Sequence, residues 1–303
     1  MMRMTEFQQK ISAIVPDIEL RFNEPMSAHT SFRIGGGAEV MAFPKDPAQL
    51  AALLKASALL DCKAAILGAG TNVLAPDAGL PGLTICLKDA LDGMEVVDSK
   101  RIRVAAGVTM TRAAVFAAGQ GLSGLEFAHG IPGTVGGGVY MNAGAYGGEI
   151  KDCCESVDVM DAQGNIRTLS CEEMGFAYRH SVLEYTNAIV LSAVFCLAPA
   201  PQEQIRARMQ ELMSKRKTSQ PLDLPSAGSA FKRPVGGYAA ALIDQAGLKG
   251  YQVGGAAVSQ KHAGFVVNLG GATAADVKTL LTQVSDKVFD ETGIRLEPEV
   301  RIW

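Results

Sequence analysis

The sequence has no uninterrupted apolar run of about 18 residues, the length that a membrane-spanning helix requires. Met1–Pro16 lacks a long apolar stretch behind a basic start, so no secretory signal peptide is predicted. Basic residues are not in excess, because 28 Lys and Arg stand against 31 Asp and Glu and give a net charge of −3. A basic face for nucleic acid is therefore not expected. These absences predict a cytoplasmic protein with neither a membrane nor a nucleic-acid partner.

Cysteine and histidine are too sparse for a metal site. The six cysteines show no CxxC spacing and only four histidines are present, so no zinc cluster is predicted. Cys153 and Cys154 are adjacent in sequence, which makes them a poor disulfide pair. The cysteines are expected to be reduced, buried or half-buried thiols.

Three familiar signatures of catalysis and nucleotide binding are also missing. Leu67–Leu74 reads LGAGTNVL and lacks the third glycine of a Rossmann fingerprint, and no convincing βαβ unit surrounds it. The chain contains no Walker loop. Ser229 stands in AGSAFK rather than in GxSxG, with no triad order around it, so a hydrolase nucleophile is not expected.

Glycine, by contrast, is concentrated in two loops. Five of the nine residues in Gly130–Gly138 are glycine, and Leu67–Leu74 forms a second such loop directly after a strand-like run. Glycine lets a ligand lie against the backbone, and bare N–H groups at such turns, or at a helix start behind them, bind anions. Each loop alone is equally well explained by tight turns. Together, with donors from Thr71, Asn72 and Thr134, they favour one large ligand that contains a pyrophosphate.

Hydrophobic periodicity predicts the remaining framework, and 303 residues suggest two or three domains. The clearest helix is Thr273–Thr292, with a capping box from Thr273 to Asp276 and a stop at Gly293. Residues 84–196 should form a mostly antiparallel sheet with a hairpin turn at 162–165. Residues 1–25 are expected to form a short lead-in helix followed by a polar connector. Other helices are expected at 47–60, 109–119, 204–217 and 238–246. Strands are expected at 40–44, 64–67, 83–87, 94–97, 101–105, 157–160, 165–169, 189–195, 265–269 and 296–302, and a linker at 199–202.

Three polar side chains outside the loops are candidates for chemistry. Arg179 always carries charge and can hold a carboxylate or enolate by two hydrogen bonds, although an isolated arginine is more often a surface residue. Ser229 is equally explained as a turn or helix-cap serine. Glu299 would share a face with Glu297 in a strand unless Pro298 breaks the alternation, and the pair could simply be solvated. The residues alone indicate an α/β protein that binds a large phosphorylated ligand.

Eight motifs, in order along the chain, resemble those of one family. They are NEPMSAHTSFRIGG from Asn23, LGAGTNVL from Leu67, GIPGTVGG from Gly130, NAGAYG from Asn142, YRHS from Tyr178, AGSAFK from Ala227, KHAGF from Lys261 and EVR from Glu299. The family is UDP-N-acetylenolpyruvoylglucosamine reductase, also called UDP-N-acetylmuramate dehydrogenase, of bacterial peptidoglycan synthesis. The chain lacks an extra tyrosine-bearing insertion and is thus similar to the shorter, type II branch.

The resemblance implies a flavoenzyme of α+β fold. A two-part FAD-binding region of the vanillyl-alcohol-oxidase/PCMH class would precede a C-terminal α/β domain for the substrate. The implied divisions are a lead-in at 1–22, FAD-binding subdomains at 23–80 and 81–200, and a substrate-binding domain at 204–303. The resemblance also implies a monomer that acts on a UDP-sugar, with NADPH as hydride donor and no metal.

By the same resemblance, both glycine loops hold the FAD pyrophosphate. The implied cofactor-binding residues are Gly68, Ala69, Gly70, Thr71, Asn72, Val73, Leu74, Gly130, Ile131, Pro132, Gly133, Thr134, Gly136 and Gly137. The implied substrate-binding residues are Tyr178, Lys217, Phe231, Lys232, Lys261 and His262, with the lysines as candidates for the phosphates. Gly138 stands where alanine is common, and Arg233 stands where asparagine is frequent, which leaves the ligand contacts of Arg233 open.

The implied reaction has two halves. NADPH gives a hydride to FAD, and N5 of the reduced flavin then gives it to C3 of the enolpyruvyl group, while C2 receives a proton. The enol ether accepts a hydride only if the charge developing on its carboxylate is stabilised. The resemblance assigns this role to Arg179 and to Glu299, which must be protonated or share a proton. Ser229 would protonate C2, with its own proton relayed from a neighbour or water.

Two other functions stay open at this point. An FAD oxidase acting on a small alcohol or sugar with O₂ would not depend on NADPH, and the motifs around Ser229 and Glu299 argue against it. A nucleotide-sugar-binding protein without catalysis would be colourless after purification. The joint presence of Arg179, Ser229 and Glu299 argues against that second function.

Overall fold

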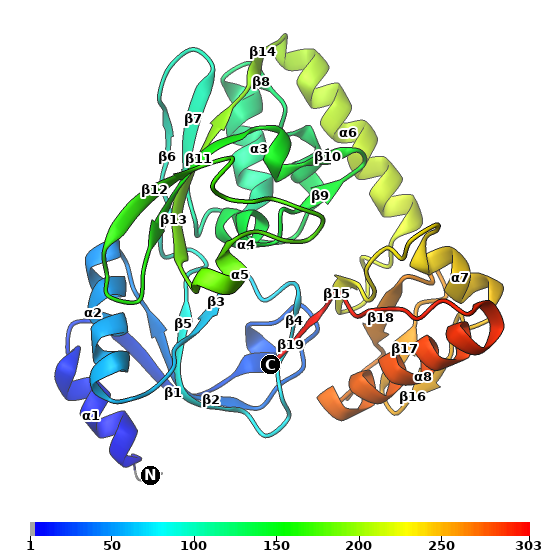
Figure 1. Cartoon of the computed structure of the whole chain (residues 1–303), viewed down its shortest axis with the longest axis horizontal. Coiled ribbons are helices and arrows are strands. Elements are labelled where there is room, and N and C mark those ends of the chain that lie inside the picture. The colour runs from blue at the N-terminus through cyan, green and yellow to red at the C-terminus, as the bar shows by residue number, and fades with distance from the viewer. Residues whose placement is uncertain (1–3) are drawn as a thin grey trace. The chain divides into compact units, whose positions relative to one another are not determined.

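The computed structural model describes residues 4–303, with helices and strands labelled as in Figure 1. Contacts within these residues define two units. Unit 1 comprises the residues up to Phe22, Glu39–Ala69 and Gly82–Lys215, and unit 2 comprises Asn23–Ala38, Gly70–Pro81 and Arg216–Trp303. Two N-terminal segments therefore fold together with the C-terminal third of the chain. No helix among the described residues is long and apolar enough to cross a membrane.

The larger sheet of unit 1 has five antiparallel strands in the order β12-β11-β13-β7-β6 (Figure 1). The strands are β6 (Met94–Val96), β7 (Arg101–Ala105), β11 (Cys154–Met160), β12 (Ile166–Ser170) and β13 (Ile189–Cys196). β13 lies in the middle of this sheet and is buried along nearly its whole length, which explains its continuous apolar run. The antiparallel sheet and the β11–β12 hairpin expected from the sequence are confirmed.

Two helices cover the larger sheet and carry the residues around the long glycine loop. α4 (Val135–Tyr140) packs on β13 and β7, and α3 (Met110–Gly119) packs on α4 and on the 3-10 helix η2 (Glu126–Gly130). Thr109 caps α3, because its hydroxyl accepts the N–H of Arg112 at 3.2 Å. The buried face of α3 is mostly alanine, which allows close packing. The glycine loop therefore lies between two anchored elements, η2 and α4.

The smaller sheet has the strand order β1-β2-β5-β3. Its strands are β1 (Glu19–Pro25), β2 (Gly37–Phe43), β3 (Ala65–Leu67) and β5 (Leu80–Cys86), and the helices near them in sequence are α1 (Glu6–Ile14) and α2 (Pro47–Leu59). α2 begins as expected, with Pro47 in its first turn and Asp46 as its cap. The polar connector predicted before residue 25 was wrong, because it forms the edge strand β1. Most β1 side chains are exposed, so no apolar alternation marks this strand in the sequence.

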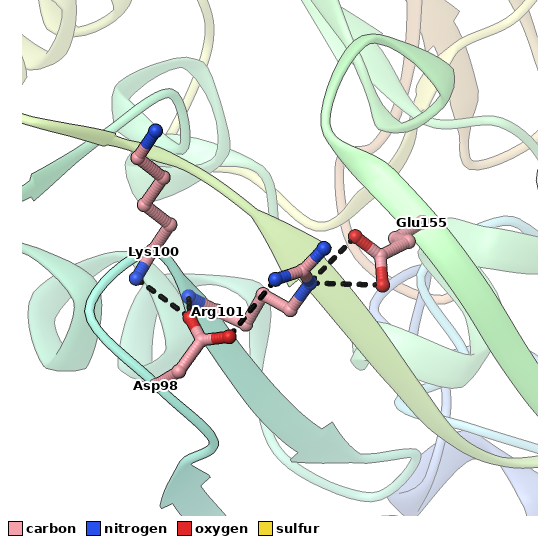
Figure 2. Close-up of polar contacts among 4 residues, drawn as sticks. All are labelled: Asp98, Lys100, Arg101 and Glu155. Carbon is pink, nitrogen blue, oxygen red and sulfur yellow. Dashed lines mark hydrogen bonds and ion pairs between the residues drawn. The ribbon is translucent and has the colours of Figure 1, made fainter.

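A charged network fastens the β6–β7 turn to β11 (Figure 2). The Asp98 carboxylate accepts the backbone N–H groups of Lys100 and Arg101 at 2.8 and 2.9 Å. The Arg101 guanidinium bonds Asp98 at 2.9 Å and both carboxylate oxygens of Glu155 at 2.7 and 2.9 Å. The pKa of Asp98 is lowered, chiefly by the hydrogen bond from Lys100. Because these side chains are solvent-exposed, the network fixes geometry more than it adds stability.

Unit 2 is built on an antiparallel sheet in the order β15-β18-β17-β16. The strands are β15 (Ser226–Ser229), β16 (Gln252–Val253), β17 (Ala256–Val258) and β18 (Phe265–Asn268). α8 (Ala274–Thr292) packs on β16, β17 and α7 (Ala239–Gln245). Its predicted stripe is buried, its capping box from Thr273 to Asp276 is formed, and Gly293 follows it with a φ of 71°. The prediction for this helix is therefore confirmed.

Other sequence predictions needed correction. Residues 296–302 were expected to form a strand, but only β19 (Arg301–Ile302) forms, in parallel with β4 (Val73–Leu74), because Pro298 interrupts the segment with an isolated bridge to Phe231. The expected linker at 199–202 was also wrong, since β14 (Ala198–Pro199) pairs with β8 (Leu122–Ser123) and α6 (Gln202–Ser219) starts there. Short elements that the sequence did not reveal are η1 (Met26–Ala28), β9 (Gly144–Ala145), β10 (Gly148–Glu149), η3 (Ile150–Asp152) and α5 (Leu183–Thr186).

Candidate functional site

The two glycine loops meet within unit 1. A Cβ atom added to Gly68 would lie 2.7 Å from the hydroxyl oxygen of Thr134, so a side chain at position 68 would push the loops apart. Thr134 is buried and caps α4, where its hydroxyl accepts the N–H of Gly137 at 3.4 Å. The residues that the sequence marked in two separate places therefore form one surface here.

Backbone donors on this surface come from the turns rather than from the helix start. The backbone N–H groups of Gly68, Ala69 and Gly133 form no hydrogen bond to an acceptor within residues 4–303. They are therefore available to bind an anion. The start of α4 is different, because the N–H of Val135 bonds Val108 at 2.8 Å and that of Gly136 bonds Ala106 at 2.9 Å. Of the two places that the sequence left open for an anion, the turns keep available N–H groups and the start of α4 does not.

Two further glycines here have packing roles. A Cβ atom on Gly136 would lie 3.0 Å from the Ala106 side chain, so glycine lets α4 approach the segment after β7. A Cβ atom on Gly138 would lie 2.7 Å from the Met110 sulfur. The presence of glycine rather than the family's common alanine at position 138 thus matches the methionine that packs against it.

His129 is a candidate site residue that the sequence reasoning did not mark. Among the described residues, its Nδ1 is the one buried side-chain nitrogen or oxygen without a hydrogen-bond partner. Burial lowers the pKa of His129, so the ring is neutral near pH 7 and has one lone pair to offer. The residue stands directly before Gly130, and this adjacency is the signal that could have identified it. An unsatisfied buried nitrogen beside the glycine loops fits a surface built to receive a polar ligand.

Arg179 lies at the tip of a tight turn in unit 1. The turn is closed by hydrogen bonds of 3.1 Å between Ala177 and His180 in both directions. Arg179 has a left-handed φ of 53°, a conformation that costs about 1–2 kcal/mol for a residue other than glycine. Its guanidinium donates to the Gly144 carbonyl at 3.3 Å and lies 5.2 Å from the ring centre of Tyr178, which is exposed. A strained arginine held by specific contacts is typical of a functional position.

The second half of the first glycine loop belongs to unit 2. Gly70 has a φ of 61°, and a Cβ atom there would lie 2.1 Å from the His29 carbonyl oxygen, so only glycine fits. The Gly70 carbonyl accepts the N–H of Ser31 at 3.0 Å. The Ser31 hydroxyl in turn donates to the Ser226 carbonyl at 2.6 Å. Ser31 therefore connects the loop at Gly70 to β15, the strand that ends at Ser229.

Ser229 and Glu299 lie on neighbouring segments of unit 2. Gly228 has a φ of 77° and stands where β15 and β18 shift register, a bulge that sets the direction of Ser229. The N–H of Glu299 bonds the Ala230 carbonyl at 2.9 Å, and the Asn72 side chain donates to the Glu299 carbonyl at 3.2 Å. Two side chains that are 70 positions apart in the sequence are thereby brought into the same part of one unit.

The lysines expected to bind phosphate lie in two settings. Lys217 and Lys261 are both exposed, and the ammonium group of Lys261 donates to the Lys217 carbonyl at 2.6 Å. Two positive charges therefore lie close to the C-terminal end of α6. Lys232 instead forms an ion pair with Glu297, so its charge is already partly balanced.

Two other predicted substrate-binding residues support the fold of unit 2. Phe231 is 4% exposed and belongs to the core, so its backbone is the part that can reach a ligand. The His262 ring accepts the N–H of Gly264 at 3.1 Å and packs edge-on against Phe265. Burial lowers the pKa of His262, so this ring is neutral near pH 7 and no cation for a phosphate. Arg233, whose role the sequence left open, stacks on the Tyr238 ring at 4.4 Å.

The six cysteines are not among the candidate site residues. All six are free, and within residues 4–303 no group of three His, Cys, Asp or Glu side chains could hold a metal ion. Burial raises the pKa of Cys153, and it raises that of Cys154 to about 12, so both thiols are protonated and unreactive. Cys196 is exposed, which corrects the expectation that every cysteine is at least half-buried.

Known proteins match the chain over nearly its full length. A model of the FAD binding domain matches residues 38–170, and a model of the UDP-N-acetylenolpyruvoylglucosamine reductase C-terminal domain matches residues 220–303. Both matches confirm the predicted fold class, an α+β FAD-binding region followed by a distinct C-terminal domain.

Full-length relatives give the same result. The chain is 45% identical to the UDP-N-acetylenolpyruvoylglucosamine reductase of Agathobacter rectalis, with 98% of each chain covered. It is 43% identical to the enzyme of the same name from Streptococcus pneumoniae strain JJA, with 97% of each covered. Its fold is similar to the crystal structure of UDP-N-acetylenolpyruvylglucosamine reductase from Thermus caldophilus, with a TM-score of 0.78, 36% identity, and 94% of this chain and 98% of that chain covered.

Proposed function

Since the chain belongs to the UDP-N-acetylenolpyruvoylglucosamine reductase family and is an oxidoreductase of peptidoglycan synthesis, we propose that it reduces UDP-N-acetylglucosamine enolpyruvate to UDP-N-acetylmuramate with NADPH as hydride donor. The observation that carries this proposal is the hydrogen bond from the Glu299 N–H to the Ala230 carbonyl, which brings the backbone of Glu299 next to the residue that follows Ser229. Both residues lie in the part of the chain that matches the reductase C-terminal domain. The reaction is inferred from the name of the relatives, and Ser229 and Glu299 have side chains whose chemistry suits it.

The loop surface in unit 1 fits the diphosphate of FAD. Gly68, Ala69 and Gly133 offer backbone N–H groups without an acceptor, Thr134 adds a hydroxyl, and His129 adds a buried nitrogen that lacks a partner. Glycine at position 68 lets the two loops approach each other closely, because a Cβ atom there would meet the Thr134 hydroxyl. The roles proposed for Gly70–Leu74, Gly130–Pro132, Gly136 and Gly137 rest on the family resemblance. When bound, FAD supplies the hydride transfer between NADPH and C3 of the enolpyruvyl group.

Arg179 is proposed to hold the substrate carboxylate. Hydride arrival at C3 pushes negative charge onto that carboxylate, and a guanidinium can bind both of its oxygens. Glu299 would assist by sharing a proton with the same group, because an ionised Glu299 would repel it. Such preorganised contacts to a developing charge are commonly worth several kcal/mol of barrier.

Ser229 is proposed to give the proton to C2. Within the described residues, its hydroxyl forms no hydrogen bond to another protein group, so it is uncommitted and can face a ligand. The hydroxyl is a weak acid, so it must be reprotonated in each turnover. Lys217 and Lys261 are proposed to bind the UDP diphosphate, because the Lys261 ammonium lies against the backbone of Lys217 and, among residues 4–303, neither lysine forms an ion pair.

The Ser229→Ala substitution tests this assignment through the two half-reactions. Anaerobic reduction of the flavin by NADPH should stay within about twofold of the unmodified protein, because no proton at C2 is involved. Reoxidation by the enolpyruvyl substrate should slow by about 10²- to 10⁴-fold, the usual cost of removing a positioned acid. Ser226→Ala on the same strand is the matched control and should leave both rates unchanged. Equal losses in both half-reactions would show that Ser229 is not the proton donor.

A further inference from the structure

The turn that carries Arg179 is not supported by a sheet. It belongs to the segment between β12 and α5, and its own closure consists of the two hydrogen bonds between Ala177 and His180. Ala177 and Tyr178 are exposed, so apolar packing does not hold its tip. A left-handed residue at the tip adds strain that surrounding contacts must offset. Other groups must therefore fix the direction of the guanidinium.

Ser181 supplies one such contact. Its side chain is completely buried, and its hydroxyl donates to the Tyr140 carbonyl at 2.8 Å. Tyr140 is the last residue of α4, the helix that follows the long glycine loop. The residue after His180 is thus tied to the same helix that Thr134 caps.

Asn142 supplies the second contact. It is completely buried and has a left-handed φ of 42°. Its amide nitrogen donates to the Ala177 carbonyl at 3.0 Å and to the Glu149 carboxylate at 2.8 Å, while its oxygen accepts the N–H of Lys151 at 3.0 Å. The three partners fix the amide orientation, because a flipped amide would place its NH₂ against the N–H of Lys151. The Ala177 carbonyl is therefore held at a defined position.

These contacts, together with the bond from Arg179 to Gly144, attach the turn to residues 140–144, a segment that begins at the last residue of α4. We propose that Asn142 and Ser181 are positioning residues for Arg179, which hold its turn so that the guanidinium meets the substrate carboxylate; this inference rests on the proposed function. Residues 140–144 are connected to the long glycine loop by α4. The position of Arg179 is therefore set relative to the loop that is proposed to bind the cofactor.

A double-mutant cycle with Arg179 tests the proposal. Asn142→Gly removes the side chain and keeps the left-handed backbone accessible. It should slow flavin reoxidation by the enolpyruvyl substrate about 10- to 100-fold, since a shift near 1 Å in a positioned group costs about that much. Reduction by NADPH and the Kd for FAD should stay within about twofold. In an Arg179→Ala background, the same substitution should slow reoxidation less than about twofold further.

Ser181→Ala should follow the same pattern. Asn187→Gly is the matched control, because Asn187 also has a left-handed φ, 53°, and forms no side-chain bond to the turn. It should change none of these rates. Equal losses from Asn142→Gly with and without Arg179 would overturn the proposal, as would equal losses in both half-reactions, because either result shows a general structural role.

A second measurement keeps the test independent of the substrate. Amide hydrogen exchange in peptides covering 176–182 should become at least about fivefold faster in Asn142→Gly, and not in Asn187→Gly. Unchanged exchange there would overturn the positioning role. If exchange accelerates but the unmodified protein is not reoxidised by the enolpyruvyl substrate, the proposed function fails while the control of the turn by Asn142 stands.

Discussion

Replacing Asp77 by alanine should loosen the first turn of α8, which lies 197 residues further along the chain. The Asp77 carboxylate accepts the N–H groups of Ala274 and Ala275 at 2.7 and 3.1 Å, and Thr273 accepts that of Asp276 at 3.0 Å. The first three N–H groups of the helix are thus satisfied by two side chains. A lost cap costs about 0.5–2 kcal/mol, and a lost negative charge at this helix end costs about 0.3–1 kcal/mol.

Asp77 is exposed, so water will replace part of what is lost, and we expect a total cost of about 1–2 kcal/mol. This corresponds to a 5- to 30-fold rise in local opening. Hydrogen exchange of peptides covering 270–282 measures it, and Asp77→Asn should show a smaller rise because it keeps one acceptor. Glu291→Ala, in the exposed last turn of α8, is the control and should leave this region unchanged. Exchange that stays within twofold in Asp77→Ala would refute the capping role.

Two more outcomes are expected. Burial, with a smaller effect from Lys249, lowers the pKa of His262 below the unfolded value of about 6.5. As the pH falls through that value, the unfolded state binds a proton that the native state does not bind. The free energy of unfolding therefore falls. His262→Asn keeps an acceptor for Gly264 but does not titrate, so its Tm should fall less between pH 7 and pH 5.5, and an unchanged pH slope would contradict this reasoning. Gly68→Ala should raise the Kd for FAD about tenfold or more, equivalent to about 1.4 kcal/mol, in a fluorescence titration of the apoprotein, because its Cβ would meet Thr134. Gly93→Ala, where a Cβ meets nothing within 4 Å, should leave the Kd unchanged.

Local signals in the sequence predicted the elements that depend on local physics. α8 has an apolar stripe, a capping box and a terminal glycine, and all three hold in the structure. β11 and β12 were predicted as two strands joined by a hairpin turn at 162–165. The strand β1 was missed because an exposed edge strand needs no alternation of apolar residues. The sequence left open whether phosphate donors lie in the turns or at the start of α4, and tertiary contacts use the N–H groups of Val135 and Gly136 at that helix start.

Long-range contacts explain why part of the site could not be predicted. The pairing of Glu299 with Ala230, and the link from Asn72 to Glu299, follow from how unit 2 folds and from no local pattern. His129 and Asn142 look ordinary in the sequence, and burial makes them informative. Asp77 likewise caps a helix that no short-range rule connects to it. Motif resemblance named the residues that are proposed to carry the chemistry, whereas the contacts around them could be found only in the structure.

The most direct test of the proposed reaction is the visible absorption spectrum of the purified protein during two anaerobic additions. The protein should be yellow, should lose its flavin absorbance on addition of NADPH, and should recover it on addition of UDP-N-acetylglucosamine enolpyruvate. Such a cycle would establish the cofactor, the hydride donor and the acceptor in one sample. Flavin that bleaches with NADPH but recovers only with O₂ would contradict the proposed acceptor. A colourless protein that takes up no added FAD would contradict the proposed cofactor site.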